Sequence, residues 1–96
     1  MIKTYIYNIL KGFLPKNSAN RMALKSLRDA GFEMPEIRKA LFVLNGITMK
    51  SLANGVSLSS LSNTVKGTRV NAHCQEILAA ALDLEVIEIF PDAGPN

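Results

Sequence analysis

The side chains best suited to contact another molecule lie between Thr48 and Arg69. Within residues 57–67, a helical period leaves a polar face opposite an apolar one. The candidate base contacts on the polar side are Leu58, Ser59, Ser60, Ser62 and Asn63. Asparagine can form two hydrogen bonds with adenine, serine can bond to several bases, and leucine can contact the methyl group of thymine. Two alternatives stay open: a solvated or phosphate-bonded Asn63, and a Leu58 that belongs to the core.

Cationic and hydroxyl side chains on either side of this face suit a nucleic-acid backbone. The candidate phosphate contacts are Thr48, Lys50, Lys66, Thr68 and Arg69. Thr48 and Lys50 open a predicted helix, where free backbone N–H groups and a cation can hold a phosphate. A solvated charge unrelated to DNA is the alternative for each lysine. No arginine lies within 57–66, which predicts modest sequence discrimination or recognition of DNA shape.

Metal and nucleophilic chemistry have little support in this sequence. His73 and Cys74 are the single histidine and cysteine, and neighbouring residues on a helix point in different directions. A metal site needs three or four ligands, and a nucleophilic pair needs a third, orienting group. We therefore expect a core cysteine and an exposed or phosphate-facing histidine. We expect no enzyme activity, and no cofactor, metal or small-molecule ligand.

Two short predicted helices position the candidate contacts. Thr48 and Ser57 are good N-caps, because a hydroxyl can accept a hydrogen bond from a free N–H group of the first turn. Leu61 and Val65 lie four apart and can bury one face of the second helix. Gly67 can end that helix in a left-handed conformation. Two short helices joined by the turn 54–56 form a helix-turn-helix signature, which predicts a DNA-binding module.

The pattern of residues 36–91 resembles the λ-repressor-like helix-turn-helix family, and within it the Ner-like and Mu-like-prophage regulators. The matching segments are 46–48, 52–53, 55–57, 61–63, 66–67, 80–82 and 88–91, together with Ile77. The resemblance implies that the first helix of the motif crosses the DNA backbone and the second enters the major groove. It also implies a homodimer that binds double-stranded DNA, and a repressor-type transcriptional regulator derived from a prophage.

One departure from the family pattern affects the turn. Only Asn54 stands between Leu52-Ala53 and Gly55-Val56-Ser57, where the family usually has three residues. Two missing residues correspond to a rotation of roughly 200° along a helix. The turn between the two helices must therefore be built differently here.

Helical periodicity extends through the rest of the chain, and no strand pattern is present. We expect an all-α bundle of about five to six helices, with further helices at 18–30, 35–44, 71–82 and 85–90. Ser18 and Asn71 are expected N-caps, with 16–18 as a loop, and Phe42 and Val43 are expected to give their helix more than one buried side. The predicted domains are an N-terminal helical extension (1–34), the helix-turn-helix domain (35–91) and a loose tail (92–96).

Residues 1–14 have apolar side chains at a helical period. A helix packed on the core, a dimerisation arm and a helix on a membrane surface are all compatible with that pattern. Lys11 interrupts the apolar run and no small-residue cleavage site follows, so we expect no signal peptide. No run is long enough to span a membrane, and we expect a cytoplasmic protein.

Charge is divided unevenly along the 96 residues, whose net charge is +3. Residues 1–35 carry +4, residues 36–70 carry +4, and residues 71–96 carry −5. A basic and an acidic half favour one surface facing a polyanion and another facing away. The alternative function is a helical protein-interaction module that has lost DNA reading. A protein interface favours aromatic side chains, Met or Arg, whereas serines and asparagine suit a DNA groove.

Overall fold

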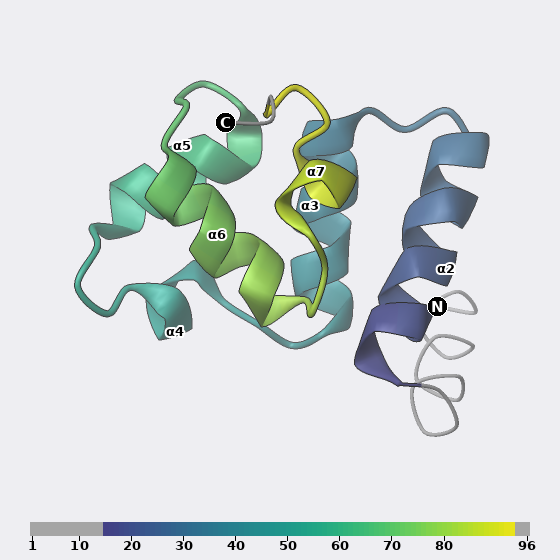
Figure 1. Cartoon of the computed structure of the whole chain (residues 1–96), viewed down its shortest axis with the longest axis horizontal. Helices are drawn as coiled ribbons and strands as arrows, with labels where there is room; N and C mark the ends of the chain where they lie inside the picture. Colours follow the sequence, from purple (N-terminus) through teal and green to yellow (C-terminus); the bar gives the residue numbers. More distant parts are fainter. Residues whose placement is uncertain (1–14, 94–96) are drawn as a thin grey trace.

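The computed structural model describes residues 15–93, which form six helices and no strand, as Figure 1 shows. The helices are α2 (Lys16–Asp29), α3 (Met34–Leu44), α4 (Met49–Leu52), α5 (Leu58–Lys66), α6 (Ala72–Ala81) and α7 (Val86–Ile89). The predicted all-α bundle is confirmed. The helix predicted over 1–14 lies outside the described residues, as do residues 94–96 of the predicted tail.

Helix α3 packs against both α2 and α5, and Figure 1 shows it between them. Its side chains Ile37 and Leu41 are fully buried, as are Leu61 from α5 and Leu78 from α6. Burial of one such aliphatic side chain contributes about 1.5–3 kcal/mol. The apolar stripes predicted from the helical period therefore meet in one core.

Three of the four predicted N-caps are confirmed. Thr48 accepts from the N–H of Ser51, Ser57 from that of Ser60 and Asn71 from that of Cys74. The prediction for Ser18 is wrong, because α2 begins earlier, at Lys16, with Pro15 before it and no side-chain cap. Pro15 is the N-cap, and its carbonyl accepts from the N–H of Ala19 at 3.1 Å, so residues 16–18 form the first turn of the helix rather than a loop.

The predicted burial of Val43 is also wrong, since 76% of its surface is exposed. Residues four apart share a helix face, so Val43 lies above Lys39, which is exposed as well. The predicted burial of Phe42 is confirmed, since that side chain is 3% exposed.

Polar side chains join α2 to the rest of the bundle. Asn20 is fully buried, and its amide donates to the carbonyl of Leu82 at 2.7 Å. Arg21 donates to both carboxylate oxygens of Glu88, from Nε at 2.6 Å and from Nη2 at 3.1 Å. Helix α2 is thus held by hydrogen bonds to α7 and to the end of α6. The division of the chain at residues 34 and 35 stays a prediction.

The ion pair between Arg21 and Glu88 predicts a pH-dependent part of the stability. The hydrogen bond from Arg21 holds the pKa of Glu88 below its ordinary 4.5. A carboxylate with a lowered folded-state pKa stabilises the fold above its unfolded pKa, and that stability is lost as pH falls through the folded value. Glu88→Gln is therefore expected to destabilise the protein at pH 7 and by less at about pH 3, because the stability that comes from the lowered pKa shrinks as pH falls below the ordinary pKa of a carboxyl group.

Urea unfolding of both proteins at the two pH values measures this difference. Glu76→Gln is the matched control, because Glu76 is exposed and its side chain forms no hydrogen bond or ion pair among residues 15–93. An equal loss of stability for Glu88→Gln at both pH values would show that the ion pair contributes nothing through its charge.

Candidate nucleic-acid interface

Helix α5 is fixed to the core by its inner face. Leu61, Thr64 and Val65 are at most 5% exposed. The hydroxyl of Thr64 donates to the carbonyl of Ser60 at 2.7 Å, so even the polar member of this face is satisfied within the helix. Because the inner residues set the rotation of α5 about its axis, they also determine which side chains face solvent.

The connection between α4 and α5 is compact and contains a left-handed glycine. Helix α4 has four residues, and residues 53–57 lead from it to α5. Gly55 has a φ of +85°, a conformation that side-chain-bearing residues rarely adopt. The N–H of Asn54 donates to the carbonyl of Leu52 at 2.8 Å, which turns the chain directly after α4. This bond and the left-handed Gly55 together form the short turn between α4 and α5.

A chain of hydrogen bonds joins the start of α5 to Arg69. The hydroxyl of Ser57 accepts from the N–H of Ser60 at 3.1 Å and donates to the hydroxyl of Ser60 at 2.7 Å. Nη1 of Arg69 donates to the same Ser60 hydroxyl at 3.2 Å. The guanidinium of Arg69 therefore lies beside the first turn of α5, although Arg69 follows the helix in the sequence.

This position of Arg69 was missed in the sequence, where the lack of an arginine within the second helix indicated weak reading of guanine. The signal that could have found it is Gly67, whose left-handed φ of +81° reverses the chain after α5. Residues after such a reversal run back along the helix, so their long side chains can reach its first turn.

The predicted base contacts are all at least partly accessible. Leu58 is 48% exposed and lies outside the core, Ser59 is exposed, and Ser60, Ser62 and Asn63 are half-buried. The side-chain amide of Asn63 forms no hydrogen bond to any residue of 15–93. Its donors and acceptor are available for a ligand, and base reading by these five residues stays a prediction.

The predicted phosphate contacts differ in how much hydrogen-bonding capacity they have left. Lys50 and Lys66 are exposed and form no ion pair within the described part of the chain. Thr48 uses an oxygen lone pair as a cap and keeps its O–H proton for another acceptor. The hydroxyl of Thr68, in contrast, donates its own proton to the carbonyl of Asn63 at 3.3 Å. Among these candidates, Thr68 is the least suited to donate to a phosphate.

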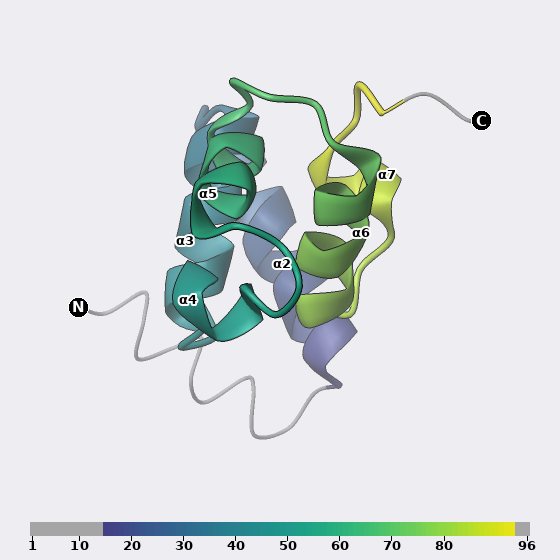
Figure 2. The same cartoon turned by 90° about the vertical axis from the view of Figure 1, so that its left-hand side faces the viewer.

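The surface around α5 is free of acidic side chains from its own segment. Residues 48–70 contain Lys50, Lys66 and Arg69 and no Asp or Glu. Figures 1 and 2 show α5 between α4 and the loop that leads to α6, so these cations flank the helix. Arg38, which the charge count placed in the basic half, is only 4% exposed and adds little to this surface.

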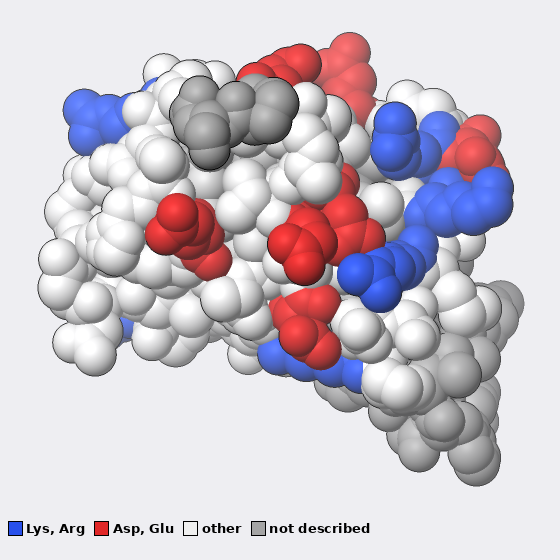
Figure 3. Space-filling model, viewed as in Figure 1, with Lys and Arg blue, Asp and Glu red and all other residues white. Residues whose placement is uncertain are grey.

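Acidic side chains gather on another face. Figure 3 shows them over the middle of the side that carries α6 and α7, with basic side chains over α2 at the right. Two of the α2 cations are paired, Arg21 with Glu88 and Lys25 with Asp29 at 3.0 Å. The pairing favours a solvated, ion-paired role for them over contact with a phosphate.

Cys74 is buried, as predicted, and His73 is exposed. Within residues 15–93, no three His, Cys, Asp or Glu side chains are grouped so that they could hold a metal ion. None of the helices of this described part is long and apolar enough to cross a membrane. A comparison with known protein families, curated proteins and solved structures found no match to this chain.

Proposed function

We propose that this protein binds double-stranded DNA by inserting α5 into the major groove, and that it regulates transcription. The observation that carries the proposal is the outer surface of α5. This surface combines small polar side chains with the guanidinium of Arg69, which donates to Ser60 at the first turn. Residues 48–70 contain no Asp or Glu. The resemblance to repressor-type prophage regulators, noted from the sequence, supports the same function.

Each part of this surface has a role in the proposal. Asn63 and the serines contact base edges, and Leu58 contacts a thymine methyl group. Lys50 and Lys66 contact phosphates on either side of the groove. Arg69 keeps several N–H donors beyond the one on Ser60, so it contacts guanine or a phosphate at the start of α5. Two copies would occupy the halves of a pseudo-palindromic site about 34–36 Å apart.

The test is fluorescence anisotropy with mixed-sequence duplex DNA at about 50 and 200 mM salt. Wild-type affinity is expected to fall steeply between the two concentrations, because bound cations release counterions from DNA. Lys66→Ala with Arg69→Ala is expected to flatten the slope of log affinity against log salt by about 2.

The matched control is Lys16→Ala with Arg28→Ala, which removes two exposed cations of α2 that form no ion pair among residues 15–93. It is expected to leave the slope close to the wild-type value. Equal flattening by both double variants would contradict docking through α5. No binding of wild-type protein at low salt would overturn the proposal.

A wild-type protein that does not bind DNA at low salt would favour a protein-interaction module. One observation supports that second function. Leu58, at the start of α5, is 48% exposed, and Val70, in the loop after α5, is 86% exposed. Exposed apolar side chains of this size are often partner contacts when they are grouped. Leu58 and Val70 stand at opposite ends of the segment 58–70, and the polar residues Ser59, Ser62 and Lys66 between them favour DNA.

A further inference from the structure

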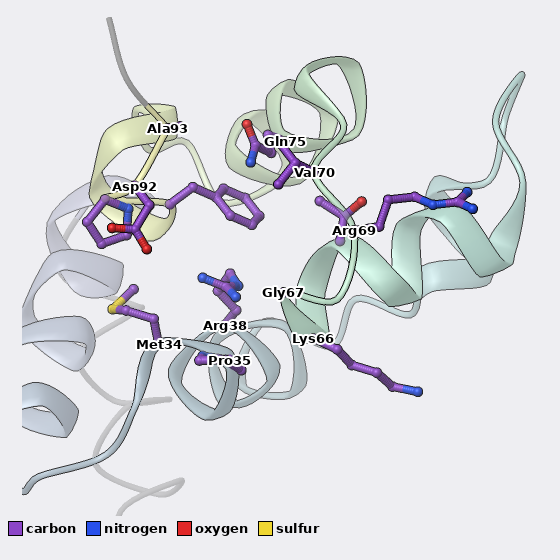
Figure 4. Close-up of a pocket in the computed structure, with 13 residues that line it drawn as sticks. Met34, Pro35, Arg38, Lys66, Gly67, Arg69, Val70, Gln75, Asp92 and Ala93 are labelled. Carbon is purple, nitrogen blue, oxygen red and sulfur yellow. The ribbon is translucent and has the colours of Figure 1, made fainter.

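A cavity of about 280 Å³ opens beneath the loop between α5 and α6. Figure 4 shows the start of α3 on one side, the α5–α6 loop on another, and the segment after α7 opposite. Apolar side chains form much of its wall, namely Met34, Pro35, Val70 and Phe90. Its volume is just below the range of about 300–1,000 Å³ that is typical of ligand pockets, which limits it to a small ligand.

The guanidinium of Arg38 faces this cavity and is only partly satisfied. Nε donates to the carbonyl of Val65 at 2.8 Å, and Nη1 donates to that of Ile89 at 2.7 Å. Nη2 forms no hydrogen bond to any residue of 15–93, and Figure 4 shows the group pointing into the cavity. No carboxylate of this part of the chain lies within 4.0 Å of it.

A second donor, from a largely buried residue, faces the same space. Gln75 is 8% exposed, and its side-chain amide forms no hydrogen bond within residues 15–93. Figure 4 shows this amide on the α6 side of the cavity, across from Arg38. Arg38 has no carboxylate within 4.0 Å, and the Gln75 amide has no hydrogen-bond partner within residues 15–93, so the cavity wall presents two donors without acceptors. Solvent reaches these donors, because no fully buried side-chain nitrogen or oxygen of the described residues lacks a hydrogen bond.

The other charged residues around the cavity accept no hydrogen bond from Arg38 or from Gln75. Lys66 and Arg69 line it with their backbones and stems, while their charged ends point away in Figure 4. Asp92 is exposed on the rim and is the single carboxylate in the lining. Burial lowers the pKa of Arg38, and the charge of Asp92 partly offsets that effect.

We propose that this cavity binds a small organic carboxylate with a compact apolar body. The carboxylate accepts from Nη2 of Arg38 and from the amide of Gln75, and the apolar body contacts Phe90 and Val70. Guanidinium and amide donors suit a planar carboxylate. The proposal does not rest on DNA binding, although the ligand would lie directly under the loop that carries Lys66 and Arg69.

The test is a titration of the ¹⁵N-labelled full chain with sodium benzoate, followed by NMR, with neutral benzamide as the probe of identical shape. Benzoate is expected to shift the Gln75 side-chain amide and the Gly67 backbone amide with saturation by about 10 mM, as for a Kd near 1 mM. Benzamide is expected to shift neither. Equal shifts with the two compounds, or none with benzoate, would overturn the proposal.

Two variants locate the site without touching Arg38, which holds the fold. Gln75→Leu keeps the volume and is expected to weaken benzoate binding by roughly threefold or more, since one donor is lost. Asp92→Asn removes the rim charge and is expected to tighten binding by roughly threefold. Unchanged affinity in both variants would place benzoate elsewhere. Inorganic phosphate that binds as tightly as benzoate would give the apolar wall no role and would also contradict the carboxylate proposal.

Discussion

Arg38→Met is expected to destabilise the protein by about 3 kcal/mol, because hydrogen bonds from a charged donor are worth about 1.5–3 kcal/mol each and two are lost. The carbonyls of Val65 and Ile89 lie in the last turns of α5 and α7, where no further helical N–H group is available to them. The variant no longer buries a charge, which offsets part of the loss. We therefore expect about 3 kcal/mol, the lower end of the range for two such hydrogen bonds.

Arg38 also contributes through its surroundings. Its guanidinium carbon lies 4.5 Å from the centre of the Phe90 ring, so the cation is stabilised by the aromatic face. One side chain of α3 thus joins the end of α5 to α7 and the segment after it. Its removal is expected to loosen the C-terminal end of α5, next to Lys66 and the α5–α6 loop.

Thermal unfolding measures this effect, and a loss of about 3 kcal/mol corresponds to a fall in Tm of about 12–24 °C for a domain of this size. Lys39→Met is the matched control, since Lys39 is the exposed neighbour of Arg38 on α3 and its replacement is expected to change stability by at most about 0.5 kcal/mol. Arg38→Lys keeps the charge but has one ammonium group for two carbonyls, so an intermediate loss is expected. Equal Tm values for Arg38→Met and Lys39→Met would contradict the role of Arg38.

The local features of the fold were predictable from the sequence because they depend on neighbouring residues. The caps Thr48, Ser57 and Asn71 each act within three residues of themselves, and the left-handed Gly67 ends its own helix. The error at residues 16–18 is local too, since the cap rule favours Ser18 whereas the carbonyl of Pro15 already accepts the first helical hydrogen bond, from Ala19.

Contacts between distant residues were not predictable in the same way. Arg38 bonds to residues 27 and 51 positions away, and the charge count treated it as a surface cation. A signal was nevertheless present, because position 38 shares a helix face with Leu41 and Phe42, which are buried. A charged residue on an apolar stripe indicates a buried hydrogen-bonded group, but the sequence does not identify its partners.

In the candidate interface, too, local features were predictable from the sequence and contacts through the loop were not. The periodicity of 57–67 correctly separated the buried residues Leu61 and Val65 from the accessible ones. The bond between Arg69 and Ser60 depends on the path of the loop after Gly67, which the sequence indicates only as a reversal. The functional roles of the accessible residues depend on a partner, and neither periodicity nor packing within this chain determines them.

Asn20→Leu is expected to destabilise the protein by about 2–4 kcal/mol, since buried groups that lose their partners cost about 1–3 kcal/mol each. The amide of Asn20 donates to the carbonyl of Leu82, and its oxygen accepts from Nδ2 of Asn45 at 2.9 Å. Leucine matches the apolar stripe of Leu24 and Leu27, but the Leu82 carbonyl and the Asn45 amide lose their hydrogen bonds to Asn20. Urea unfolding measures the loss.

Asn20→Asp separates the hydrogen bonds from the shape of the side chain. An ionised carboxylate would accept from Asn45 but would face the carbonyl of Leu82 with no proton to donate, in a fully buried position. Burial favours its neutral form and raises its folded-state pKa above the unfolded value of about 3.9. A group with a raised folded-state pKa stabilises the fold below its unfolded pKa, and that stability is lost as pH rises through the folded value.

The stability difference between wild type and Asn20→Asp is therefore expected to be large at pH 7 and small at about pH 4, where the protonated carboxyl group of the variant restores both hydrogen bonds. Asn54→Asp, at an exposed asparagine of the α4–α5 turn, is the control and is expected to show no such recovery. The recovery runs opposite to the acid-induced loss expected for the Glu88 ion pair, so it cannot arise from a general effect of pH on the fold. A difference that stays constant from pH 7 to pH 4 would show that the site accepts the charge, with water or a rearranged Asn45 in place of the bond to Leu82.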